Sequence, residues 1–261
     1  MPDRPSPADP SPGSIPGMSD FTAEDLFDAV DRLVGELLTH HGFEEPPVDA
    51  VALAQEAFDL TVREADEEDD PRQGRFGPRP PRRRGREVVF RPDQSEESRQ
   101  AVCARACAKE LIPAVLTRLG VAPGTENKSA QTSLVGLIAP RLLLPTRWFG
   151  RDARKSGYDL FAIKDRYPTA GYEMIALRML ELDEPCVVAV VDDGIVATRR
   201  GNRAPATKTL TPAEELCLER IGRNGDREPQ TARRDGWTVH GWPVPSGPFN
   251  RIILRAVPED V

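Results

Sequence analysis

The chain has 261 residues, of which 39% are apolar, so it is long enough for one large or two modest domains with a real core. The formal net charge of -7 excludes a basic surface over the whole chain, although it is compatible with local basic patches. The sequence has no apolar run near the length of a membrane span and no signal-peptide core at its N-terminus. We therefore expect a cytoplasmic protein without membrane partners, and composition leaves its oligomeric state open.

Residues 1–18 combine six prolines with Ser, Asp and Gly, a composition that predicts a disordered leader. Apolar residues then recur at helical spacing over 21–38, with Ser19 or Asp20 as the expected N-cap. Gly42 is expected to end this helix, because glycine readily adopts the left-handed conformation that terminates helices. The first ordered element is thus an amphipathic helix that begins directly after the leader.

A second helix over 49–58 and a short strand over 60–63 follow the first helix. Residues 64–86 then form a charged loop, whose first part is acidic at six of seven positions and whose second part carries seven arginines. Opposed charge blocks usually form a solvated loop, which we favour over a binding site for nucleic acid or an acidic partner. Residues 87–91 are predicted to be the second strand of a hairpin that this loop interrupts.

The segment 99–120 has the pattern of a buried helix, and the apolar segment 131–149 follows it as a second buried helix. Residues four apart lie on one side of a helix. The apolar stripe with this spacing consists of Cys103, Cys107, Leu111, Val115 and Leu119. Arg105 and Lys109 share a different face. The two segments are expected to form the core of the N-terminal half.

The same segments carry a series of short motifs: Arg-Gln (99–100), Leu-Ile-Pro (111–113), Leu-Gly (119–120) and Leu-Leu-Leu-Pro-x-x-Trp-Phe (142–149). This series resembles the ImmA/IrrE family of zinc metallopeptidase-like proteins. In that family the first helix carries H-E-x-x-H or a related motif, in which two ligands on one helical face bind zinc and the Glu acts as general base. The resemblance implies a zincin-like fold and, in an active bacterial member, cleavage of a regulator such as a repressor protein.

The chain departs from the family pattern at every chemical position. Aligned on the family landmarks, the first zinc ligand falls on Arg105, the general base on Ala106 and the second ligand on Lys109. The third, acidic ligand falls on Thr132. These four residues are therefore the remnants of a site whose chemistry has been substituted.

A different register is suggested by Ala-Lys-Glu-Leu at 108–111. It keeps Glu110 as the base but puts Lys109 and Pro113 at the ligand positions. Lys and Arg are cationic donors at neutral pH, so they cannot ligate a dication and they repel it. Both registers predict that the chain holds no catalytic zinc, and no motif points to another cofactor.

The remaining His and Cys residues form no other recognisable site. His40 and His41 are adjacent and diverge by about a hundred degrees around a helix, so they cannot chelate together, and a role at the helix end is favoured. His240 lies in a predicted strand without a carboxylate or thiolate nearby in the sequence, which favours a structural role. The four cysteines lack a C-x-x-C pair and are predicted to be buried, reduced thiols: Cys103, Cys107, Cys186 and Cys217.

Two shorter helices are predicted over 157–167 and 169–182, with Thr169 as the N-cap of the second. The pair is helix-turn-helix-like, an arrangement that some members of the resembled family possess. Because the second helix is not strongly basic, we favour a packing role over DNA binding. If the pair bound duplex DNA, Lys164 and Arg178 would be the expected phosphate contacts.

The C-terminal part predicts one helix and a small antiparallel sheet. Residues 185–199 form a hairpin around an Asp-Asp-Gly turn at 192–194. Thr211 is expected to cap a helix over 212–221. Two further strands should pair with the hairpin: 237–242 and 250–257.

The sequence therefore predicts an α+β protein in three parts. These are the leader 1–18, a peptidase-like domain over 19–150 that contains the charged loop, and a helix pair with a small sheet over 151–261. Loss of the ligands and the base favours a pseudo-peptidase that binds a protein partner. A divergent active zinc endopeptidase and a DNA-binding regulator remain the alternatives.

The fate of the remnant cleft depends on Arg105 and Lys109, which repel each other and are costly to bury. Either an internal carboxylate fills the cleft and closes it, or the cleft stays open as a groove for an acidic peptide or a partner's carboxylate. The nearby internal candidates are Glu110 and Glu126. Glu110 is poorly placed for either cation by helical geometry, so we favour the open groove.

Overall fold

The computed structural model describes residues 22–65, 86–122, 124, 127–203, 206–223, 225, 228–246 and 249–259. The predicted leader and most of the charged loop lie outside these ranges. The chain divides into two compact units, Met1–Trp148 and Phe149–Val261. Each unit combines helices with a sheet, which confirms the α+β prediction.

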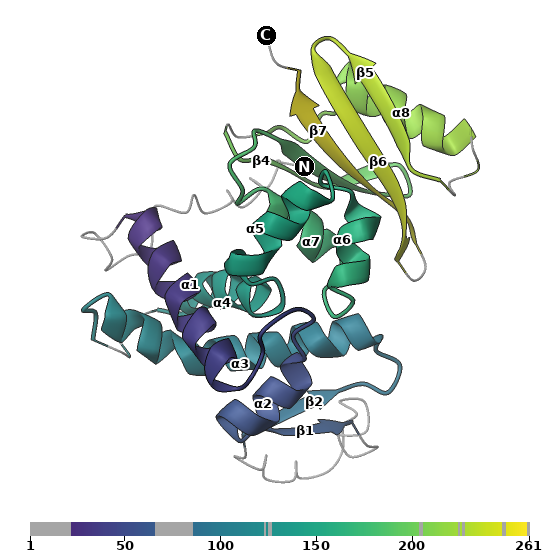
Figure 1. Ribbon diagram of the computed structural model, residues 1–261. Coiled ribbons are helices and arrows are strands. Elements are labelled where there is room, and N and C mark those ends of the chain that lie inside the picture. Colours follow the sequence, from purple (N-terminus) through teal and green to yellow (C-terminus); the bar gives the residue numbers. More distant parts are fainter. Residues whose placement is uncertain are drawn as a thin grey trace, which may run out of the picture. The chain divides into compact units, whose positions relative to one another are not determined.

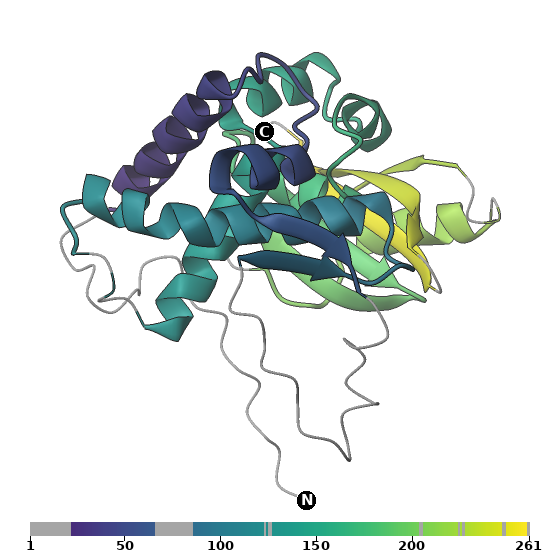
Figure 2. The ribbon, with the colours of Figure 1, turned by 90° about the horizontal axis from the view of Figure 1, so that it is seen from below.

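The first unit is built around one long helix, α3. Its elements are α1 (Ala23–His40), α2 (Ala50–Phe58), β1 (Thr61–Glu64), β2 (Glu87–Phe90), α3 (Glu96–Arg118) and α4 (Lys128–Leu143). Helices α2 and α4 pack along α3, and the two short strands lie beside its first half (Figures 1 and 2). The predicted apolar stripe on α3 is buried along its whole length, which confirms its role as core.

Helix α1 begins at a capping box rather than at the expected Ser19 or Asp20. The Thr22 hydroxyl accepts a hydrogen bond from the Asp25 N–H at 3.1 Å, and the Asp25 carboxylate accepts from the Thr22 N–H at 3.0 Å. This reciprocal pairing satisfies two free backbone donors, so Thr22 is the better cap. Gly42 follows the helix with a φ of 75°, which confirms the predicted stop.

Strands β1 and β2 pair in parallel, so the predicted interrupted hairpin is wrong. A hairpin needs only a short turn, whereas parallel strands need a connection of about a dozen residues or more. The charged segment 64–86 provides that length. Sequence alternation gives the strands themselves but not their relative direction, which explains the error.

The apolar segment after α3 forms two helices instead of the single helix predicted over 131–149. Helix α4 ends at Leu143, and α5 (Thr146–Lys155) begins after Pro145. Proline lacks an N–H donor and disfavours helical geometry in the residue before it, here Leu144. Helix α5 spans the boundary between the two units, and sequence analysis did not identify it as a separate element.

The second unit contains a five-stranded antiparallel sheet in the order β4-β3-β7-β6-β5. Its elements after α5 are α6 (Leu160–Arg166), α7 (Tyr172–Met179), β3 (Val187–Asp192), β4 (Ile195–Gly201), α8 (Pro212–Arg223), β5 (Gln230–Arg234), β6 (Trp237–Ser246) and β7 (Phe249–Pro258). The predicted hairpin is confirmed as β3–β4, with positive φ at Asp193 and Gly194 in its turn. Strand β5 was not predicted, because Ala232 is its only buried residue and gives no alternating pattern.

Helix α8 packs on one face of this sheet (Figure 1). Thr211 caps it as predicted: its N–H donates to Glu214 at 2.6 Å, and its hydroxyl accepts from the Glu214 N–H at 3.3 Å. Helix α8 approaches the sheet closely at Gly241 of β6. A Cβ atom there would lie 2.7 Å from Ile221 and 2.8 Å from Cys217. Only glycine permits this packing distance.

The second predicted cap, Thr169, is wrong. Helix α7 begins at Tyr172 with Gly171 as N-cap and without a side-chain cap. The intervening turn is fixed instead by the Lys164 ammonium, which donates to the carbonyls of Pro168 and Ala170, both at 2.8 Å. The turn therefore occupies the residues that were assigned to the first turn of the helix.

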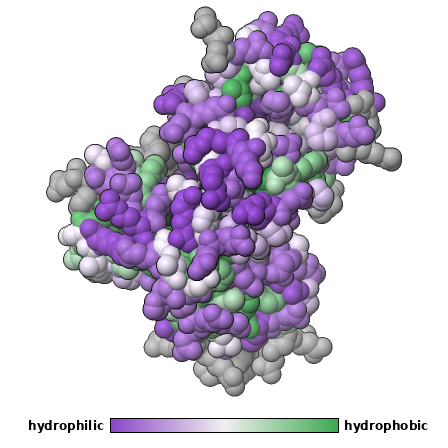
Figure 3. All heavy atoms as spheres, viewed as in Figure 1, coloured by the Kyte–Doolittle hydropathy of each residue, from purple (hydrophilic) through white to green (hydrophobic). Residues whose placement is uncertain are grey.

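All four cysteines are buried, as predicted. Burial raises the pKa of the Cys103 thiol to about 11 and that of Cys107 to about 12. Within the described ranges, no helix is both long and apolar enough to cross a membrane. The face drawn in Figure 3 is mainly hydrophilic, and the apolar residues visible on it form separate small patches.

Candidate functional site

The four remnant-site positions lie on α3 and α4 of the first unit. Arg105 and Lys109 are exposed on α3, and Ala106 beside them is half-buried. Thr132 is exposed near the start of α4, where its hydroxyl donates to the Lys128 carbonyl at 2.8 Å. The two cations thus face solvent one helical turn apart, and the threonine is used by its own helix.

Of the two internal carboxylates considered for this site, Glu110 lies among the described residues. Glu110 forms an ion pair with Arg86, the residue just before β2. Glu126 lies outside the described residues. Across the ranges that the structure describes, no hydrogen bond or ion pair reaches the side chain of Arg105 or Lys109. Both cationic side chains are therefore exposed without a carboxylate partner among the described residues.

The three His side chains contact neighbouring side chains. His40 and His41 sit at the end of α1 with their rings in edge contact, 5.0 Å between centroids. His240 Nδ1 lies 3.1 Å from the Thr231 hydroxyl, and its ring stacks on Trp242. Among the described residues there is no group of three or more His, Cys, Asp and Glu side chains that could hold a metal ion.

A cavity of about 600 Å³ lies beside His240 in the second unit. Arg255 is 4% exposed there, pairs with Glu184 and lies over the Tyr158 ring at 4.2 Å. Burial lowers the pKa of His240, and the positive charge of Arg255 lowers it further. The imidazole is therefore neutral at physiological pH, and the buried Nε of Arg255 has no hydrogen-bond partner within the described residues.

The helix-turn-helix-like pair uses its two candidate DNA contacts internally. The Lys164 ammonium bonds the two turn carbonyls and lies 5.3 Å from the Tyr172 ring centroid. Arg178 is 2% exposed and donates to Glu181 at 2.6 Å. Glu173, on the same helix, accepts from Arg251 of β7 at 2.9 Å. Glu173 thus ties helix α7 to strand β7, whereas Lys164 and Arg178 bond to groups within the segment 164–181.

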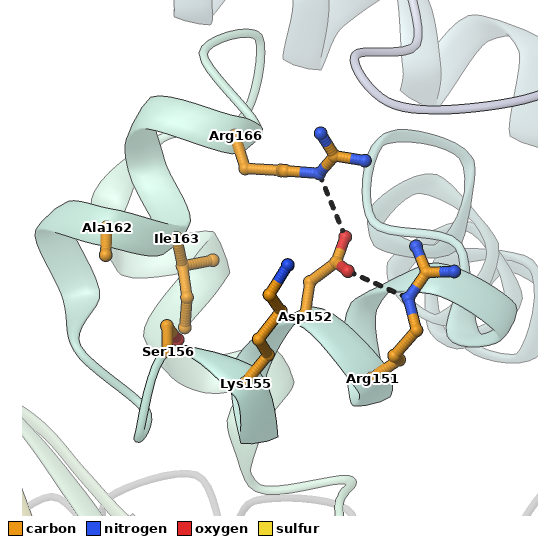
Figure 4. A pocket seen from close by; sticks show the side chains of 7 residues that line it. All are labelled: Arg151, Asp152, Lys155, Ser156, Ala162, Ile163 and Arg166. Carbon is orange, nitrogen blue, oxygen red and sulfur yellow. Dashed lines mark hydrogen bonds and ion pairs between the residues drawn. The ribbon is translucent and has the colours of Figure 1, made fainter.

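A basic cavity of about 550 Å³ lies between α5 and α6 (Figure 4). Its lining side chains are Arg151, Asp152, Lys155, Ser156, Ala162, Ile163 and Arg166. Figure 4 shows Arg151 and Arg166 reaching Asp152 from two sides, while Lys155 extends from α5 into the space toward α6. The cavity therefore gathers three cationic side chains around one carboxylate.

Asp152 organises this cluster. It accepts hydrogen bonds from Arg151 Nε at 3.0 Å, Arg166 Nε at 3.2 Å and the Tyr167 hydroxyl at 2.9 Å. Desolvation alone would raise the pKa of Asp152, but these bonds outweigh it and the pKa is lowered. Burial and the same carboxylate raise the pKa of Tyr167. Asp152 is therefore ionised and Tyr167 is a neutral donor at physiological pH.

Sequence analysis missed this cavity because α5 was merged with the apolar segment before it. Its signal is nevertheless present in the sequence. Phe149 and Ala153 are buried four residues apart, whereas Arg151, Arg154 and Lys155 are exposed on the other side. A separate amphipathic helix after Pro145 would have placed these cations together.

Comparison with known proteins gives a fold but no family. No protein family matches the sequence, and no curated protein matches it. Among solved structures, the chain is similar to a Mycobacterium tuberculosis transcriptional regulator, with a TM-score of 0.57 and 16% sequence identity. The similarity covers 90% of this chain and 80% of that chain. At this identity it shows a shared fold alone.

Proposed function

We propose that the protein is a pseudo-peptidase with an ImmA/IrrE-like N-terminal unit, which acts as a regulator by binding an acidic segment of a protein partner. The main observation behind this proposal is that Arg105 and Lys109 lie on α3 with both side chains exposed. They stand at the positions where the resembled family has its two helical zinc ligands. A cationic pair in that place suits a carboxylate better than a metal ion.

Arg105 and Lys109 are two like charges one helical turn apart. Each destabilises the other in the free protein by a few tenths of a kcal/mol. An acidic side chain about 4 Å from one of them gains roughly 1 kcal/mol in water and about 4 kcal/mol near a protein surface. Glu110, the closest carboxylate in sequence, pairs with Arg86 and leaves this role to another molecule.

A regulatory role agrees with the name of the structural neighbour, which is a transcriptional regulator. The similarity in fold does not carry that protein's partners or targets to this chain. A regulatory role is common to this proposal and to the DNA-binding candidate, so the name does not favour one over the other.

The runner-up is a divergent zinc endopeptidase. Arg105, Ala106 and Lys109 offer no zinc ligand, so we expect protein purified without chelators to contain no stoichiometric zinc. Metal analysis tests this directly, and one tightly held zinc per chain would reverse the order of the two proposals.

The third candidate is a DNA-binding regulator that uses α6 and α7. The internal roles of Lys164 and Arg178 count against it, because neither cation is presented to a phosphate. We expect no specific duplex binding at physiological salt. A specific complex that weakens with salt, and weakens further in the Lys164→Ala variant, would favour this candidate instead.

The main experiment compares affinity capture from the native host by three proteins. These are the wild type, the Arg105→Glu, Lys109→Glu variant and an Arg32→Glu, Lys128→Glu control that makes the same change in charge at exposed positions outside α3. The partner should be retained by the wild type and the control and lost by the α3 variant. Circular dichroism verifies that all three fold.

A direct binding assay completes the comparison. A fluorescent Glu-rich peptide should bind the wild type and the control more tightly than the α3 variant. If all three proteins capture the same partners and bind the peptide equally, or if none captures or binds anything, the proposal fails.

A further inference from the structure

We propose that the cavity between α5 and α6 is a binding site for the phosphate group of a small phosphorylated molecule, with Lys155 as its main anchor. This inference concerns the second unit and is independent of the α3 proposal. It rests on the charges, the geometry and the size of the cavity in Figure 4.

The side chains that line the cavity carry an excess of positive charge. Three cationic side chains line the cavity together with one carboxylate, that of Asp152. Arg151 and Arg166 are both tied to Asp152 through Nε. For Lys155, the described part of the chain supplies neither a hydrogen bond nor an ion pair, and Figure 4 shows this side chain directed into the cavity. Lys155 is therefore the centre of the excess positive charge.

The charged side chains of the cavity are held in place before a ligand binds. The Asp152 side chain is only 11% exposed, and it accepts a hydrogen bond from the hydroxyl of the buried Tyr167. The carboxylate therefore acts as a positioning group that holds both guanidinium groups at the rim before any ligand arrives. A site with its side chains already ordered loses less conformational entropy on binding. Arginine and lysine together are the usual partners of phosphate oxygens.

The size of the cavity suits a small molecule. The volume of about 550 Å³ lies within the range of roughly 300–1,000 Å³ that is typical of small-molecule sites. Ala162 and Ile163 of α6 add apolar surface to the lining, which suits the carbon skeleton of a phosphate ester. These features favour a small molecule over the extended backbone of a nucleic acid, which binds to open basic surfaces.

The chain provides a matched control for the anchor. Arg154 precedes Lys155 on the same helix and is also exposed, but it does not line the cavity. Removing either side chain deletes one positive charge from α5. Only the loss of Lys155 should affect a ligand inside the cavity.

The test is calorimetric titration of the full chain and its Lys155→Ala and Arg154→Ala variants with inorganic phosphate, AMP, adenosine and a 20-base-pair DNA duplex as probes. We expect AMP or phosphate to bind the wild type and adenosine to bind at least tenfold more weakly than AMP. Lys155→Ala should weaken binding of the phosphate-bearing probe about tenfold or more, because a charge-assisted hydrogen bond is lost. Arg154→Ala should change it less than twofold.

Four results would overturn the proposal. One is that neither phosphate nor AMP binds at millimolar concentration. Another is that adenosine binds as well as AMP, or that the two variants have equal effects. The last is that the duplex binds more tightly than AMP and loses affinity equally in both variants, which would make α5 a nucleic-acid surface rather than the wall of a small-molecule site.

Discussion

Replacing Arg199 with Met tests how the second unit is held together. Arg199 lies on β4 with its side chain 7% exposed, and it meets the fully buried carboxylate of Glu214 on α8. Its Nε lies 3.0 and 3.2 Å from the two carboxylate oxygens, and an Nη donates to the Thr207 carbonyl at 3.0 Å. Methionine keeps much of the volume of the side chain but none of these bonds.

The expected cost follows from the burial of Glu214. Removing one partner of a buried ion pair leaves an uncompensated charge and costs about 3–5 kcal/mol. For a unit of roughly one hundred residues, 1 kcal/mol shifts the melting temperature by about 4 °C, so we expect a decrease of about 12–20 °C. In the double variant Arg199→Met, Glu214→Gln the buried charge is removed, so at least half of this loss should be recovered.

Thermal and urea unfolding followed by tryptophan fluorescence measure the effect, since Trp237 and Trp242 report on the sheet of this unit. The control is Arg200→Met, the exposed neighbour on the same strand, which should change stability by less than about 0.5 kcal/mol. Equal stability of the Arg199 and Arg200 variants, or a double variant that is no more stable than Arg199→Met alone, would refute the reasoning.

Two further predictions concern the same sheet. Gly241→Ala forces a methyl group against Cys217 and Leu254, so it should destabilise the protein by about 1–3 kcal/mol in urea unfolding, and an unchanged midpoint would show that α8 can move away without cost. The hydrogen bond from Arg251 lowers the pKa of Asp192 below its ordinary value of 3.8. The stability that this carboxylate adds over an Asp192→Asn variant should therefore be complete above pH 3.8 and should decline as the pH falls further. A stability difference that stays constant down to pH 2 would contradict this.

Local signals in the sequence were sufficient for elements that depend on neighbouring residues. The Asp-Asp-Gly turn of the β3–β4 hairpin and the cap at Thr211 are decided by residues at most three positions apart. The shared face of Arg105 and Lys109 likewise follows from helical spacing alone, and both side chains are exposed.

Features that depend on distant residues could not be predicted in this way. The parallel direction of β2 and the ion pair of Glu110 with Arg86 join residues at least 24 positions apart in the first unit. The basic cavity needs α5 to separate from α4 at Pro145 and α6 to fold back beside it. The charge and hydrophobic patterns indicate which cationic residues α5 and α6 carry. They do not indicate the chain reversal that brings the two helices together.

The two edges of the five-stranded sheet limit how the second unit can associate with other chains. The edge strands are β4 and β5, and each presents arginine to solvent, including Arg200 on β4 and both Arg233 and Arg234 on β5. Charged side chains on an exposed edge oppose the addition of a strand from a second molecule and so protect a sheet against aggregation. A partner of this unit is therefore expected to recognise side chains, and backbone pairing that extends the sheet is disfavoured.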